Sequence, residues 1–238
     1  MNLLFLNGLL KGFFFRLRGQ YLVPAKFFNF LAHLSDLSRF INTHKTIEYC
    51  DFYTRKRDYD KRLQMFEYLI TKYDLDAPLD YMEFGVSTGI SFKWWVNKLK
   101  NPETRFYGFD TFSGLPEDWG PFKKGEMNNG NVAPTIEGDK RHSFYQGLFQ
   151  QTLIPFLSNQ KLSRRKVIHL DADLYSSTLY VLTLMTPYLQ KGDILLFDEF
   201  NVPMHEYKAF KEWTEAFYIK YEVLASVNNF YQTAFMIL

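Results

Sequence analysis

The stretch Tyr81-Met-Glu-Phe-Gly-Val-Ser-Thr-Gly89 decides the fold of this 238-residue chain. Its first four residues predict a short buried strand that ends at Gly85, and residues 90–99 predict a helix that follows at once. The two glycines of the connecting loop let the backbone bend tightly between these elements. A strand, a short loop and a helix in succession begin a βα unit, which is typical of parallel sheets.

The same alternation continues to the end of the chain. Further strands are expected over residues 105–109, 143–147, 167–170 and 194–197, and helices over 58–73, 152–157, 176–190 and 206–218. Two last strands, 221–225 and 233–238, are joined around Asn228-Asn229, a turn signal. The sequence therefore predicts an α/β, Rossmann-like fold. Its mostly parallel seven-stranded sheet carries an antiparallel C-terminal hairpin and helices on both faces.

Composition excludes several classes of protein. Hydrophobic residues make up 47% of the chain and charged residues 23%, a globular balance that excludes wholesale disorder. The net charge of +2 makes the chain a poor candidate for a general nucleic-acid binder. Cys50 is the only cysteine, so we expect neither an internal disulfide nor a CxxC zinc site.

Residues 1–57 are predicted to form a helical N-terminal arm ahead of a single domain at 58–238. Residues 1–40 carry five Lys and Arg against Asp36 alone, and their apolar residues recur at helical spacing: Leu3, Leu6, Leu10, Phe13 and Leu17. Three interpretations of this segment remain, namely a packing arm or homodimer contact, a peripheral membrane foot, and a flexible tail.

Acidic residues follow the predicted strands of the domain. In a parallel sheet, the carboxyl ends of the strands meet at one edge, and ligands bind beyond it. Strand ends also favour Asp as a turn or helix N-cap residue, which explains one or two of these acids but explains six poorly. The six are Glu83, Asp110, Asp171, Asp173, Asp198 and Glu199.

Four interpretations of the glycine loop at 83–89 compete. A nicotinamide fingerprint fails because Ser87 replaces its second glycine, and a P-loop fails because no lysine follows Gly89 in register. The match to GxSxG is literal and makes Ser87 a candidate hydrolase nucleophile. The fourth pattern, E-x-G-x-x-x-G, is that of a loop that wraps the amino-acid end of S-adenosylmethionine, with Asp110 placed to accept both ribose hydroxyls.

Several blocks together resemble the class I S-adenosylmethionine-dependent methyltransferases of the macrocin O-methyltransferase type. The resemblance covers roughly residues 58–225 in the order of that family. The blocks are Glu83-Phe-Gly-Val86 with Gly89, Tyr107-Gly-Phe-Asp-Thr-Phe-Ser-Gly-Leu-Pro116, Gly147-Leu-Phe-Gln-Gln-Thr-Leu153, His169-Leu-Asp-Ala-Asp-Leu-Tyr-Ser-Ser-Thr178, and Leu196-Phe-Asp-Glu-Phe200 with His205-Glu-Tyr-Lys-Ala209.

The resemblance implies a role for each block. The cofactor loop falls on Glu83, Gly85, Val86 and Gly89, the ribose-binding acid on Asp110, and the border of the adenine on Gly147, Leu148 and Phe149. A Mg²⁺ ion would be held by Asp171, Asp198 and Glu199, with Asp173 in reserve. Related enzymes carry Asp-Asp or Asp-Asn where this chain has Asp198-Glu199, so the longer side chain of Glu199 changes the expected geometry.

The resulting hypothesis is a cytoplasmic, S-adenosylmethionine-dependent O-methyltransferase that acts, with a divalent metal, on a hydroxyl of a small molecule or sugar. Its catalytic residues would be Asp171 and, as the general base, His205, whereas His169 is expected to be structural. The irregular segment 111–141, which contains Trp119, is expected to cover the pocket. Two alternatives remain: a glycosyltransferase that uses Asp171-Ala-Asp173 as a DxD motif, and a non-catalytic scaffold.

Overall fold

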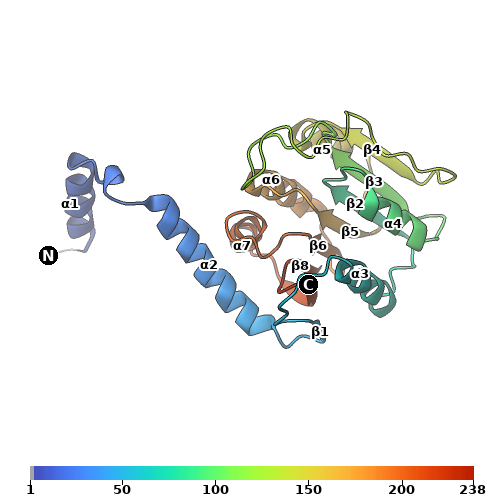
Figure 1. Ribbon diagram of the computed structural model, residues 1–238, viewed down its shortest axis with the longest axis horizontal. Helices are drawn as coiled ribbons and strands as arrows, with labels where there is room; N and C mark the ends of the chain where they lie inside the picture. Colours follow the sequence, from blue (N-terminus) through green and yellow to red (C-terminus); the bar gives the residue numbers. More distant parts are fainter. Residues whose placement is uncertain (1–2) are drawn as a thin grey trace.

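An eight-stranded sheet forms the centre of the protein (Figure 1). The structure is a computed structural model and describes residues 3–238; residues 1 and 2 of the predicted arm lie outside the described residues. The strands follow the order β1-β7-β8-β6-β5-β2-β3-β4, and β8 runs antiparallel to both of its neighbours. Their bounds are β1 Tyr49–Cys50, β2 Leu79–Phe84, β3 Arg105–Asp110, β4 His142–Gln146, β5 Arg165–Leu170, β6 Ile194–Phe197, β7 Tyr221–Val227 and β8 Gln232–Ile237.

Helices cover both faces of the sheet because its strands present apolar side chains on both sides. One core forms between the sheet and α5, α6 and α7, and includes Phe84, Phe109 and Phe197. The second core forms between the sheet and α3 and α4, and includes Tyr81 and Phe106. The bounds of these helices are α3 Lys61–Lys72, α4 Ile90–Lys98, α5 Phe149–Asn159, α6 Tyr175–Met185 and α7 Glu206–Ala216.

The predicted fold class is confirmed, and the structure adds one strand to it. All seven predicted strands are present, with the antiparallel pair β7–β8 at the C-terminal end of the chain. The eighth strand, β1, pairs in parallel with β7 at the edge of the sheet. Two residues are too few to show a strand periodicity, so the sequence assigned them to the helical arm. The helix expected over 176–190 ends at Met185, where a 3₁₀ turn at Thr186–Tyr188 contains Pro187.

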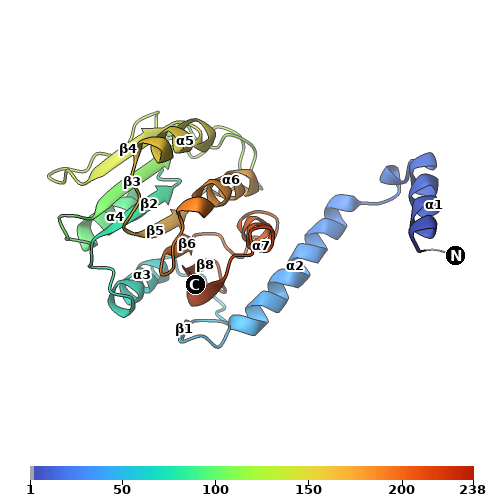
Figure 2. The same cartoon turned by 180° about the vertical axis from the view of Figure 1, so that it is seen from behind.

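The N-terminal segment extends away from the domain (Figures 1 and 2). It consists of α1 Leu3–Arg16, a 3₁₀ turn at Gly19–Tyr21 and α2 Ala25–His44. Only the C-terminal end of α2 joins the core, where Leu37 is buried and Phe40 contacts several aromatic rings, including that of Phe235. No helix within residues 3–238 combines the length and the apolar character that a bilayer crossing requires.

Candidate active site

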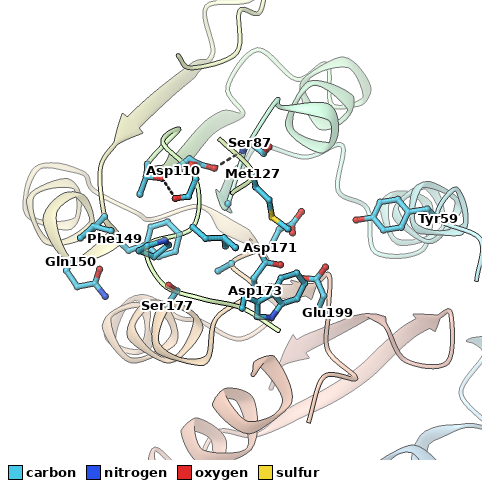
Figure 3. Close-up of a pocket in the computed structure, with 18 residues that line it drawn as sticks. Tyr59, Ser87, Asp110, Met127, Phe149, Gln150, Asp171, Asp173, Ser177 and Glu199 are labelled. Atoms are coloured by element: carbon cyan, nitrogen blue, oxygen red, sulfur yellow. Dashed lines mark hydrogen bonds between the residues drawn. The ribbon is translucent and has the colours of Figure 1, made fainter. Parts of the chain in front are cut away.

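A cavity of about 260 Å³ opens at the carboxyl ends of β2, β3 and β5 and beside Glu199, the second residue after β6 (Figure 3). This is the edge at which parallel sheets bind ligands. Its walls come from the glycine loop, the start of α5, the segment after β5 and the irregular segment 111–141. The lining residues are Tyr59, Gly85, Ser87, Asp110, Thr111, Gly114, Leu115, Pro116, Trp119, Met127, Leu148, Phe149, Gln150, Asp171, Ala172, Asp173, Ser177 and Glu199.

The first glycine of the loop is required by the backbone beside it. Gly85 has a φ of +96°, and a Cβ atom there would lie 1.7 Å from the carbonyl oxygen of Asp171. The loop can therefore lie against the end of β5 only if residue 85 is glycine. A Cβ atom at Gly89 would lie 2.7 Å from Pro134, so this second glycine lets segment 111–141 close over the loop.

Asp110 ties the glycine loop to the end of β3. Its Oδ2 accepts hydrogen bonds from the backbone N–H groups of Val86 (2.8 Å) and Ser87 (2.7 Å), and its Oδ1 accepts one from Phe112 (2.6 Å). A carboxylate has about four lone-pair sites, so these three bonds leave capacity for a further donor. Asp110 also lines the cavity, and its assignment to a ribose remains a prediction.

The other predicted cofactor residues divide into two groups. Leu148 and Phe149 line the cavity together with Gly85 and Asp110. Residues of the second group support the wall from behind and do not line it: Glu83, Val86, Gly89 and Gly147.

Glu83 illustrates this supporting position. Its side chain is fully buried and accepts hydrogen bonds from Tyr81 and, at 2.7 Å, from the Ser91 hydroxyl of α4. The carboxylate therefore joins β2 to the first turn of α4. In this position Glu83 fixes the geometry of the loop that lies between those two elements.

Three carboxylates gather on one wall of the cavity. Asp171, Asp173 and Glu199 each offer an oxygen within 4.8 Å of the others, and Figure 3 shows them side by side. Burial raises the pKa of Asp171 well above its usual value, and the charges of Asp198 and Glu199 raise it further. Burial likewise raises the pKa of Asp173 to about 6 and the pKa of Glu199 well above its ordinary value.

The residues of this cluster fit a hard divalent cation. Such ions prefer several oxygen ligands, and a positive charge would relieve the mutual repulsion that raises these pKa values. Glu199 provides a specific indication. Its Oε1 accepts a hydrogen bond from Tyr231 at 3.0 Å, whereas its Oε2 is buried and has no hydrogen-bond partner within the described residues.

Asp198, a predicted metal ligand, has a different environment. It is fully buried, does not line the cavity, and its two oxygens accept hydrogen bonds from side chains of α3 and of the residues just before it. The Arg62 guanidinium donates to Oδ1 at 2.7 Å, and the Tyr59 hydroxyl donates to Oδ2. Arg62 also lies 3.6 Å from Asp171. A cation of the chain itself therefore lies between two of the residues to which the sequence assigned the metal.

The turn between β7 and β8 positions this pair. Asn228 accepts a hydrogen bond from the backbone N–H of Asp58 (2.9 Å) and donates one to its carbonyl oxygen (2.9 Å). Asn229 holds Thr54 in the same way. The segment that leads into α3 is thus fixed to the sheet, and this places Tyr59 and Arg62 beside Asp198.

Sequence reasoning did not identify Tyr59 or Arg62, although one signal was present. Arg62 precedes Phe66 by four residues and Leu69 by seven, so it lies on the buried face of α3. An arginine on an apolar helical face requires a buried acid as its partner. The sequence does not say which acid it meets.

Segment 111–141 covers the cavity, as predicted. Leu115, Trp119 and Met127 line it, and Phe112 is buried beneath the segment. Glu117 accepts a 2.7 Å hydrogen bond from Ser176, which fixes this cover to the start of α6.

The histidines lie outside the cavity wall. The His205 ring packs edge-on against Trp119 with 6.4 Å between ring centroids, and burial lowers its pKa. Trp119 lines the cavity and His205 does not, so the base role of His205 remains a prediction that its position does not favour. His169 is buried and shares a 2.9 Å hydrogen bond with Tyr81, which agrees with the structural role expected for it.

Comparison with protein families finds a match to this chain. Residues 82–200, half of the chain, match the model of a family described as "Methyltransferase domain". The match runs from β2 to the residues that follow β6 and so contains most of the cavity wall. No curated protein sequence matches the chain at a significant level.

Solved structures with the same fold include three O-methyltransferases or related proteins. CalS11, a calicheamicin methyltransferase, is 20% identical with a TM-score of 0.58, over 90% of this chain and 93% of its own. NovP, an O-methyltransferase, is 22% identical with a TM-score of 0.54, over 74% and 78% of the two chains. A structure of cmcI with Mg and SAM is 15% identical with a TM-score of 0.51, over 76% and 72%. At these identities, the similarity establishes the fold.

Proposed function

Because this chain belongs to the methyltransferase domain family, it is an S-adenosylmethionine-dependent enzyme, and we propose that it methylates a hydroxyl oxygen of a small molecule or sugar. Membership in this family replaces the hydrolase and glycosyltransferase alternatives, and the cluster of carboxylates in the cavity argues against a non-catalytic methyltransferase-like scaffold. Within the described residues, the hydrogen bonds of Ser87 involve only its backbone, so no histidine activates its hydroxyl. Asp171-Ala-Asp173 lines the same cavity as the glycine loop. A glycosyltransferase function would leave the glycine loop without a role.

One observation carries this proposal: a single cavity brings the glycine loop and Asp110 together with Asp171, Asp173 and Glu199. The first group suits S-adenosylmethionine, and the second suits a hydroxyl that must lose its proton. A structural neighbour supports the choice of oxygen and sugar. CalS11 is described as a TDP-rhamnose 3'-O-methyltransferase in a second structure, which is 21% identical with a TM-score of 0.54 over 87% of this chain and 93% of its own.

The chemistry is an in-line displacement. The acceptor oxygen forms a bond to the methyl carbon as the bond from that carbon to the sulfonium sulfur breaks, leaving neutral S-adenosylhomocysteine. Most of the rate enhancement comes from alignment, which contributes about 7–11 kcal/mol in favourable cases. Two aromatic side chains that line the cavity, Phe149 and Trp119, would contribute to this alignment.

We assign Asp173 as the base that accepts the proton of the hydroxyl. It lines the cavity, and its pKa of about 6 lets its carboxylate be ionised near neutral pH while remaining more basic than an ordinary aspartate. Asp171, the predicted catalytic acid, lies beside it and would orient the acceptor. A divalent cation held by Asp171 and Glu199 would lower the pKa of the hydroxyl and would leave Asp173 free to accept its proton.

The test combines binding with turnover. We expect calorimetric titration of the purified chain to give micromolar binding of S-adenosylmethionine and of S-adenosylhomocysteine. Release of S-adenosylhomocysteine would then be followed with sugar nucleotides and phenols as acceptors. Asp173→Asn should retain cofactor affinity and lose turnover, and the matched variant Asp76→Asn, at an exposed acid outside the cavity, should retain both. Absence of cofactor binding would contradict the proposal.

We also propose a cytoplasmic location, which is supported by the cofactor and by the single thiol, Cys50. Cell fractionation should recover the domain on the cytoplasmic side. Recovery on the opposite side would contradict the proposal.

A further inference from the structure

The N-terminal helices carry the most apolar exposed surface of the protein. Residues 6–34, the part of the predicted N-terminal arm (1–57) that is called the arm from here on, include 15 of the 27 exposed large hydrophobic side chains of the described residues. Phe13 is 63% exposed and Leu22 is 75% exposed. Single exposed apolar residues are normal, but a continuous set of this size marks an interaction surface. The domain does not cover it, as both views of the chain show (Figures 1 and 2).

The charge of the arm identifies the kind of partner. Residues 6–34 contain Lys11, Arg16, Arg18 and Lys26 and no acidic residue. At roughly 100° per residue, Leu6, Leu10 and Phe13 form one stripe along α1. Arg16 lies beside this stripe, whereas Lys11 lies farther round the helix. Basic side chains beside an apolar stripe place their charged ends at the headgroup level when the stripe enters a membrane.

The exposed part of α2 repeats this arrangement. Phe27, Phe30, Leu31 and Leu34 lie on one face, and Lys26 lies at its border. Both helices therefore combine an apolar stripe with positive charge. From these observations, we propose that the arm binds the surface of an anionic lipid bilayer.

A second copy of the chain is a less suitable occupant. Two arms in contact would bring eight Lys and Arg residues together with no acid among them. The domain also offers no comparable surface, because its exposed large hydrophobics come one to three at a time from separate segments, such as Ile90, Ile154 and Phe217. An anionic lipid surface satisfies the apolar stripes and the charge together.

Vesicle flotation of the full chain tests this proposal. We expect binding to vesicles of phosphatidylcholine with phosphatidylglycerol, at least about tenfold weaker binding to phosphatidylcholine alone, and release as the salt concentration rises. Replacing two cations by Lys11→Gln and Arg16→Gln should weaken binding to the anionic vesicles about thirtyfold, from the usual contribution of a basic residue near such a surface. The matched pair Lys100→Gln and Lys140→Gln, at exposed sites of the domain, should not.

The apolar stripe is tested separately with Leu10→Ser and Phe13→Ser, which should abolish vesicle binding. Titration with S-adenosylmethionine shows whether each variant retains a folded domain, since the arm does not line the cavity. Equal binding to both kinds of vesicle, or no effect of the Lys11 and Arg16 changes, would overturn the proposal. A chain that binds no vesicle and is a dimer in solution, which the Leu10 and Phe13 changes convert to a monomer, would assign the arm to a second copy instead.

Discussion

Replacing Arg62 tests whether its guanidinium compensates the acids at the base of the cavity. The variant Arg62→Leu removes the cation 2.7 Å from Asp198 and 3.6 Å from Asp171 and keeps most of the side-chain volume. Asp198 is fully buried, and only 7% of the Arg62 side chain is exposed. Removal of one partner of a buried ion pair leaves an uncompensated charge and costs about 3–5 kcal/mol.

This cost can be converted into a melting temperature. The entropy of unfolding is roughly 2 cal/mol/K per residue, which is about 0.5 kcal/mol/K for 238 residues. We therefore expect Arg62→Leu to melt about 6–10 °C below the wild type. Chemical denaturation should show the same loss of unfolding free energy with little change in its dependence on denaturant.

Added Mg²⁺ gives the prediction a second readout. When the Arg62 guanidinium is absent, one Mg²⁺ ion can bind between the carboxylates of Asp171 and Asp198. Added Mg²⁺ should therefore stabilise the variant more than the wild type. Arg164→Leu is the matched control, because it removes the partner of another buried acid, Asp80, which lies outside the cavity. It should lower stability without any gain in the response to Mg²⁺.

Two results would refute this reasoning. A loss below about 1 kcal/mol in Arg62→Leu would mean that the guanidinium does not compensate Asp198. Additive losses in Arg62→Leu and Asp198→Asn would mean that the two groups are not coupled, since contacting partners give a double variant that is less damaged than the sum.

Three further outcomes are expected. Asp110→Ala removes the acceptor of three backbone N–H groups in and beside the glycine loop, so calorimetry should show cofactor affinity reduced at least about tenfold and the melting temperature lowered. Gly85→Ala would place a Cβ atom 1.7 Å from a backbone oxygen and should melt several degrees lower still, whereas Gly120→Ala, which has open space around it, should cost much less. The pKa of Asp173 is raised from 3.8 to about 6 in the folded state, so the folded chain binds more protons than the unfolded chain between these pH values. The contribution of Asp173 to stability should therefore rise as the pH falls through 6. The variant Asp173→Asn should remove this part of the pH dependence of the melting temperature.

The layers of the fold were predictable because most of the central strands are apolar runs bounded by turn residues. The run at 194–197 predicts β6 to the residue, and the Asn228-Asn229 signal predicts the turn of the C-terminal hairpin. The sequence did not predict strand β1, because its two residues show no periodicity and because its pairing partner, β7, lies far along the chain. Sequence patterns report local preferences, and this strand is fixed by contacts distant in sequence.

The identity of the acidic residues that line the cavity was less predictable than the position of the cavity in the fold. The rule that ligands bind beyond strand ends correctly placed Asp110, Asp171 and Glu199 at the cavity. It could not separate Asp173, which lines the cavity, from Asp198, which is turned to Arg62. Both acids follow strands, and the direction of each side chain depends on its three-dimensional partners.

The position of Arg62 connects these two difficulties. The segment that contains β1 also leads into α3, and the Asn228-Asn229 turn holds it against the sheet. The pairing of β1 at the edge of the sheet therefore determines which acid pairs with the Arg62 guanidinium. It thereby also determines which carboxylates remain in the cavity. The residues that distinguish this site from a generic set of strand-end acids come from outside the βα units, where a motif search does not look.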